Sequence, residues 1–208
     1  GAVSGIDLGD PDAKPGRAPR IGVCKSPSWE QAAPETEALL PRVAEALAKA
    51  GARVRDFELP APFAALKDAH PVVMNGESAR ALGWELAHRR DGISPGLLER
   101  LEFGLSQAGA PLARAQAVFA ELQTAFAPSM GDLDVLITPS APGEAPEGLD
   151  WTGDPAFNYI WTSLHVPCVT VPAGMGRNGL PLGIQIVGRR GDDRATLAWA
   201  AWVAAAIG

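Results

Sequence analysis

The sequence predicts an α/β protein, because short apolar runs typical of strands alternate with long segments of helical periodicity. Residues 20–24 (RIGVC) and 53–59 (RVRDFEL) are predicted strands. The helix between them begins near Pro34 and ends near Lys49, with Gly51 just beyond it. Since a strand–helix–strand unit of this length usually joins parallel strands, we expect a parallel pair.

The rest of the chain is predicted to add a helical middle, three more strands and a closing helix. Residues 63–127 are expected to form a long, a short and a second long helix, with breaks at 91–95 (DGISP) and 108–111 (AGAP). Further strands are predicted at 134–138, stopped by Pro139, and at 166–172 and 182–187. Because Asn178-Gly179 is a strong turn signal, we expect the last two strands to form a hairpin, followed by a helix at 193–206.

Length and charge limit the classes of function. A chain of 208 residues, about half of them apolar, predicts one domain, and residues 1–19 are rich in Gly, Pro and Asp, which predicts a linker. The formal charge of −6 arises without a long run of like charge, so no nucleic-acid partner and no polybasic membrane patch are expected. No apolar stretch is long enough to span a membrane and no signal peptide is evident, so we expect a cytoplasmic protein without a membrane partner.

The cysteines and histidines predict neither a disulfide nor a metal site. Cys24 and Cys168 each belong to an apolar run, which predicts buried free thiols in a reducing compartment. His70, His88 and His165 lie far apart and share no ligand spacing with either cysteine. We therefore expect no metal and no cofactor.

The last third of the chain carries four motifs in a characteristic order: 134–142 (DVLITPSAP), 157–162 (FNYIWT), 166–174 (VPCVTVPAG) and 179–189 (GLPLGIQIVGR). In order, spacing and identity they resemble the C-terminal part of an amidase signature enzyme, such as an amidase or the A subunit of glutamyl-tRNA amidotransferase. The resemblance extends from about Ala2 to Ile207. It implies a mixed β-sheet with helices packed on both faces, and hydrolysis of a non-peptide carboxamide to an acid and ammonia or an amine through an acyl-serine intermediate.

The resemblance also implies that the catalytic residues lie outside this chain. In the family a lysine acts through a serine that follows a cis peptide bond and activates the nucleophilic serine. Here no two serines are adjacent, and none of the four lysines stands beside a Gly/Ser-rich loop. We therefore assign no catalytic residue and expect residues 20–208 to be the C-terminal part of a single amidase domain, inactive alone, with residues 1–19 leading from a missing upstream core.

Four residues are candidates for substrate binding: Phe157, Asn158, Trp161 and Thr162. The resemblance places their predicted helix near the pocket that receives the acyl group of the amide. The same spacing also fits a buried pair of Phe157 and Trp161, with Asn158 as a local cap, and this alternative stays open. His165 stands where glycine is commoner in the family's L-x-G-V-P turn.

Other polar residues are expected to be structural. Thr138, Ser140 and Ser163 lack a neighbouring base, and Glu77 and Glu85 fit the solvated face of a helix. Glycines 174, 176 and 179 precede a strand, which predicts a turn rather than a phosphate loop.

The expected partners are a small-molecule amide and the missing N-terminal catalytic half, and a homodimer of the full-length protein is a further option. A second hypothesis is a complete, non-catalytic binding or scaffold subunit that pairs with a separate catalytic polypeptide. Unpaired sheet edges and apolar helix faces favour the fragment over this second hypothesis.

Overall fold

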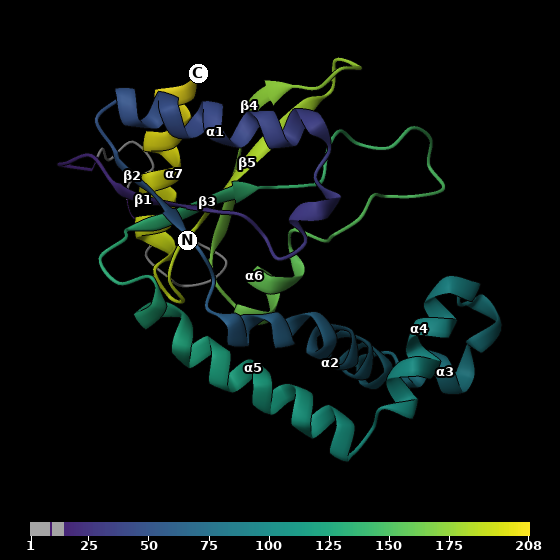
Figure 1. Cartoon of the computed structure of the whole chain (residues 1–208). Helices are drawn as coiled ribbons and strands as arrows, with labels where there is room; N and C mark the ends of the chain where they lie inside the picture. Colours follow the sequence, from purple (N-terminus) through teal and green to yellow (C-terminus); the bar gives the residue numbers. More distant parts are fainter. Residues whose placement is uncertain (1–8, 10–14) are drawn as a thin grey trace. The chain divides into compact units, whose positions relative to one another are not determined.

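The computed structural model describes Gly9 and residues 15–208, so most of the predicted linker at 1–19 lies outside the described residues. The chain forms two compact units, Gly1–Pro60 with Ala125–Gly208, and Ala61–Thr124. Figure 1 shows the strands in the first unit and a run of helices in the second. Membership of residues 20–208 in a single amidase domain stays a prediction.

The first unit is built on a five-stranded mixed sheet with the order β2-β1-β3-β5-β4. Its strands are β1 (Arg20–Cys24), β2 (Arg53–Phe57), β3 (Val135–Pro139), β4 (Cys168–Met175) and β5 (Pro181–Val187). β1 is parallel to β2 and to β3, whereas β5 is antiparallel to β3 and to β4. The predicted parallel pair and the predicted hairpin are both confirmed.

Four of the five strands differ from the prediction in their boundaries. β2 ends at Phe57 rather than at residue 59, and β5 begins one residue earlier, at Pro181. Pro139 does not stop β3 but belongs to it, opposite Ile184, because a proline at the end of a strand removes no needed ladder donor. β4 begins at Cys168 rather than at residue 166 and continues to Met175, because hairpin pairing with β5 persists past an irregularity between Pro172 and Gly174.

One face of the sheet is covered by α1 (Pro34–Lys49) and α7 (Asp193–Ile207), as Figure 1 shows. The apolar side chains that alternate along the strands meet the apolar stripes of these helices in one buried cluster. The cluster includes Ile21, Val135, Ile137, Ile184 and Ile186 from the strands, and Leu39, Leu40, Val43, Leu47, Ala200 and Val203 from the helices. Each large side chain buried there stabilises the fold by about 1.5–3 kcal/mol.

The opposite face carries the other residues of the same strands. Leu136, Thr138, Gln185 and Val187 are buried there, and the segment leading into the short helix α6 (Tyr159–Leu164) lies against this face, because Asn158 is hydrogen-bonded to Gln185. Helical segments thus cover both faces of the mixed sheet.

The two cysteines differ in environment, and the prediction of buried thiols is correct for only one of them. Cys24 ends the inner strand β1 and is buried, which raises the pKa of its thiol to about 12. Cys168 is exposed, because β4 is an edge strand and its outer positions lack a neighbouring strand.

The second unit is helical, as predicted, and contains one break that the sequence pattern did not predict. Leu82 separates α2 from α3 with a non-helical backbone. The elements of residues 61–129 are η2 (Ala61–Ala65), α2 (Leu66–Ala81), α3 (Gly83–His88), η3 (Arg90–Gly92), α4 (Pro95–Ser106) and α5 (Ala110–Ser129). No helix in the described part of the chain is long and apolar enough to cross a membrane.

A single carboxylate anchors the start of β1. Asp134, just before β3, accepts two 2.7 Å hydrogen bonds from the Arg17 guanidinium and further bonds from the backbone and side chain of Arg20. Desolvation opposes ionisation here, but these hydrogen bonds outweigh it and hold the pKa of Asp134 well below its usual value.

We expect Asp134→Asn to destabilise the protein near neutral pH, and we expect this destabilisation to become smaller as the pH falls. Because the folded-state pKa of Asp134 is depressed, its charge stabilises the fold above the unfolded pKa of about 3.9, and this stabilisation is lost as the pH falls through the folded value. Urea unfolding midpoints measured from neutral pH into the acid range check this. The matched variant Asp132→Asn, at a carboxylate 65% exposed, should shift the midpoint less. A pH-independent difference between Asp134→Asn and wild type would contradict the assignment.

We expect Gly104→Ala to destabilise the helical unit by about 1–3 kcal/mol. Helices α2 and α4 approach closely at this glycine, and a β-carbon there would overlap the backbone carbonyl of Asn75. Gly96 lies on the same helix with nothing within 4 Å of its β-carbon position, so Gly96→Ala is the control and should leave stability unchanged or raise it slightly. Thermal unfolding of both variants measures the difference, and equal melting temperatures would contradict the close packing.

Candidate functional site

A row of polar side chains crosses three strands on the sheet face opposite α1 and α7. Gln185 of β5 lies between Thr138 of β3 and Thr170 of β4 in the antiparallel register. Thr138 and Gln185 are buried, whereas Thr170 on the edge strand is exposed. Burial of the Gln185 amide is costly unless the amide is hydrogen-bonded, so the hydrogen-bond partners of Gln185 define the site.

Asn158 connects this row of side chains to the loop after β3 through two hydrogen bonds. Its Nδ2 donates to the backbone carbonyl oxygen of Ser140 at 2.9 Å, and its Oδ1 accepts from Gln185 Nε2 at 2.9 Å. Asn158 occupies the N-cap position of α6, but its side chain makes no capping hydrogen bond. The alternative of a local cap is therefore wrong, because both hydrogen-bonding ends of the amide are used by partners distant in sequence.

Ser140 links this network to the edge strand. Its Oγ lies 3.2 Å from Thr170 Oγ1, and its backbone N–H donates to the carbonyl oxygen of Gly183 at 3.1 Å. Gly183 is the residue that permits this approach, since a β-carbon there would lie 2.7 Å from Thr170 and 2.8 Å from the Ser140 hydroxyl. We call Ser140, Asn158, Thr170 and Gln185 the polar network.

Phe157 and Trp161 are core residues, as the alternative interpretation predicts. Their exposed fractions are 1% and 2%. Phe157 contacts Trp29 edge-on, with ring centroids 6.3 Å apart, and Trp161 contacts Phe126 in the same manner at 6.0 Å. Phe157 precedes α6 rather than belonging to it, and Thr162 is exposed.

Two buried polar atoms beside the network have no hydrogen-bond partner among the described residues. They are Trp161 Nε1 and Thr138 Oγ1. A buried donor or acceptor without a partner typically costs about 1–3 kcal/mol.

The turn after α6 adopts the conformation that the family motif requires. His165 has φ = 52°, the only positive φ among the described non-glycine residues, and its side chain is exposed. A left-handed backbone at this position explains why glycine is commoner there, and the sequence comparison within the motif correctly singled out this residue.

Glu144 connects the loop after β3 to the tip of the β4–β5 hairpin. Its carboxylate accepts hydrogen bonds from the backbone N–H groups of Asn178 and Leu180 and from Asn178 Nδ2. Although desolvation opposes it, these bonds lower the pKa of Glu144. The glycines at 174–179 thus form a hairpin turn, as predicted, with Gly179 at φ = 79°.

Other polar side chains make contacts that fit structural roles. Ser163 Oγ donates to the carbonyl oxygen of Tyr159, and Lys25 lies over the Trp29 ring. Lys49 is paired with Glu45, and Glu77 accepts a hydrogen bond from Gln116 on a neighbouring helix of its own unit. In the part of the chain that the structure describes, no three His, Cys, Asp or Glu side chains gather as a metal site. Lys14 lies outside the described residues.

The sequence motifs identified Asn158 as a candidate, but they did not identify Gln185 and Thr170, which belong to the same polar network. Gln185 could have been found, because it is the single polar residue in an apolar run and strand alternation turns it away from Ile184 and Ile186. Thr170 required knowledge of the register between β4 and β5.

Comparison with known proteins identifies the family. The sequence pattern that defines the amidase family matches residues 7–197, and the chain therefore belongs to the amidase family. A crystal structure of an amidase superposes with a TM-score of 0.82 at 25% identity, covering 94% of this chain and 48% of that one. The fold is that of the amidase signature enzymes.

Two curated relatives illustrate the range of the family. A 2-amino-5-chloromuconic acid deaminase of Comamonas testosteroni is 26% identical over 91% of this chain and 43% of its own length. The A subunit of the glutamyl-tRNA(Gln) amidotransferase of Novosphingobium aromaticivorans is 32% identical over 53% of this chain and 25% of its own. The chain thus spans less than half the length of these relatives.

We expect Asn158→Ala to destabilise the first unit by about 1–3 kcal/mol, because it leaves the Ser140 carbonyl and the Gln185 amide without their partner. Thr162→Ala, a truncation four residues away at an exposed position, is the control and should change stability by less than about 0.5 kcal/mol. Chemical denaturation of both variants is the measurement. An Asn158→Ala protein as stable as Thr162→Ala would show that the network does not hold the sheet to the segment before α6.

Proposed function

We propose that this chain is the C-terminal segment of an amidase that hydrolyses a carboxamide C–N bond to an acid and ammonia or an amine. The acyl-serine chemistry would be performed by a Ser-cisSer-Lys set in an upstream half. The family match over residues 7–197 carries this proposal. Ser140 Oγ lies beside Thr170 Oγ1, Lys25 lies over the Trp29 ring and Lys49 is paired with Glu45, which supports the assignment of catalysis to another segment.

In this proposal the sheet face with the polar network forms part of the wall of the substrate pocket. Asn158 and Thr162 would face the amide, while Phe157 and Trp161 would shape the wall from behind, since both rings are buried. Ser140 follows directly after β3, and ligands of open α/β sheets bind beyond such carboxyl ends. Asn158 is partly exposed, and its amide has a second N–H and a second oxygen lone pair beyond those used by Ser140 and Gln185, so it is suited to orient a carboxamide.

The upstream half is the proposed partner of this segment, and the edge strand β4 is the feature that supports it. β4 has a neighbour on one side only, and Cys168, Thr170 and Pro172 are exposed on it. An eight-residue edge with free backbone groups favours addition of a further strand. We propose a cytoplasmic location, which the two free thiols support, and a homodimer as an assembly of the full-length protein.

We expect the purified 208-residue chain to release no ammonia from aromatic, aliphatic or urea-like amides. Without a base to activate it, a serine hydroxyl is a weak nucleophile, so no acyl-enzyme forms. A coupled ammonia assay checks this. Ser140→Ala is the control variant: hydrolysis by the wild-type chain that this variant abolishes would overturn the proposal, whereas hydrolysis unaffected by Ser140→Ala and Ser163→Ala identifies a contaminant.

Reading the gene in frame upstream of the Gly1 codon separates the proposal from its alternative, a non-catalytic subunit that is complete in itself. A continuous frame that encodes adjacent serines and an earlier lysine supports the amidase segment. A stop codon followed by a start codon next to Gly1 supports the alternative, and would contradict the proposal of an upstream half on the same polypeptide.

A further inference from the structure

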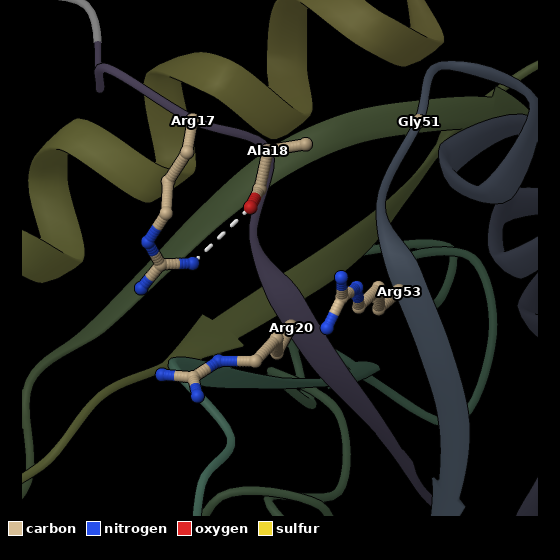
Figure 2. Close-up of a pocket in the computed structure, with 5 residues that line it drawn as sticks. All are labelled: Arg17, Ala18, Arg20, Gly51 and Arg53. Carbon is tan, nitrogen blue, oxygen red and sulfur yellow. Dashed lines mark hydrogen bonds between the residues drawn. The ribbon is translucent and has the colours of Figure 1, made fainter.

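A basic pocket lies where β1 and β2 begin. It has a volume of about 440 Å³ and is lined by Arg17, Ala18, Arg20, Gly51 and Arg53 (Figure 2). Arg20 and Arg53 are directly opposite each other in the parallel pair. Because β3 is parallel to β1 and the polar network follows the end of β3, the pocket and the network lie at opposite ends of the sheet.

The charges around this pocket are unequal. Asp134 is shared by Arg17 and Arg20, and Asp132 lies 2.7 Å from Arg55 and 3.7 Å from Arg20. The Arg53 side chain is exposed and has neither a hydrogen bond nor an ion pair with any described residue. Three arginines line the pocket, and one aspartate, Asp134, is bonded to two of them, while Arg55 and Asp132 pair with each other beside it. Among the described residues this leaves an excess of two positive charges, with the Arg53 guanidinium available to a ligand.

The remaining walls leave room for a ligand. A β-carbon on Gly51 would have only the Ala18 methyl nearby, at 4.0 Å. Gly51 has φ = 99°, a conformation that disfavours any larger residue, so the backbone itself keeps this wall open. Figure 2 shows Ala18 and Gly51 on neighbouring segments of the chain, with Arg20 and Arg53 drawn below them.

The C-terminus of α1 borders the pocket, but it repels a bound anion only weakly. A helix C-terminus carries partial negative charge on its last carbonyl groups. Here those of Ala46, Leu47 and Ala48 accept hydrogen bonds from Ala50, Ala52 and Gly51. They are therefore already paired with backbone donors.

We infer that this pocket binds a small divalent oxyanion, either orthophosphate or the phosphate group of a phosphomonoester. Guanidinium groups match the geometry of phosphate oxygens, and the excess of two positive charges matches a dianion. Arg53 supplies the free donors. Arg17 and Arg20 are held in place by Asp134, and Arg17 also donates to the Ala18 carbonyl oxygen at 3.2 Å, so these two arginines present only their remaining N–H groups.

Calorimetric titration of the 208-residue chain with orthophosphate at constant ionic strength tests this inference. We expect saturable binding that Arg53→Gln and Ala18→Glu each weaken by at least about tenfold. The first variant removes the free guanidinium, and the second places a carboxylate in the pocket. Arg114→Gln, which removes an equal charge from an exposed site in the helical unit, should leave the affinity unchanged.

The same titration with phenyl phosphate separates the two sources of the anion. Tighter binding of phenyl phosphate assigns the pocket to a phosphorylated organic molecule, and tighter binding of orthophosphate assigns it to the free ion. Absence of saturable binding of either at millimolar concentrations overturns the inference. So does an equal loss of affinity in Arg114→Gln, which would show diffuse attraction rather than a site.

Discussion

The register between β3 and β5 is the constraint on which the rest of the first unit depends. Because both strands are buried on both faces, each residue has an assigned side: Ile184 and Ile186 meet α1 and α7, and Gln185 meets Asn158. A slip by one residue would put the glutamine amide into the apolar cluster and two isoleucines against the amide of Asn158. The packing of the core and the position of the polar network are thus determined together.

The local pattern of the sequence predicted most of this fold, because apolar runs and glycine–proline punctuation are local signals. Helix α1 was predicted from Pro34 to Lys49, and Asn178-Gly179 correctly predicted the hairpin. The break at Leu82 was missed although Gly83 follows it directly, because an isolated glycine is often tolerated within a helical pattern. The exposure of Cys168 was missed because the position of β4 at the edge depends on strand order, which apolar patterning does not encode.

The candidate site was predictable only in part, for a related physical reason. Motif resemblance singled out Asn158, but its partners Ser140 and Gln185 lie 18 and 27 residues away and are brought to it by the sheet. The burial of Phe157 and Trp161 followed from their apolar character. The arginine pocket was not foreseen, since Arg17, Arg20 and Arg53 are separate single charges in the sequence that converge only when β1 and β2 pair.

Glu144 has a mechanical consequence for the surface near the network. Its three N–H donors come from a hairpin tip 34 residues away, so one carboxylate joins two segments that the sheet alone would leave independent. The loop after Ser140 and the hairpin are therefore coupled, and a displacement of the β4–β5 tip pulls on the chain that leaves Ser140. Without the Glu144 carboxylate, the hairpin tip and the loop after Ser140 would be joined by the sheet alone.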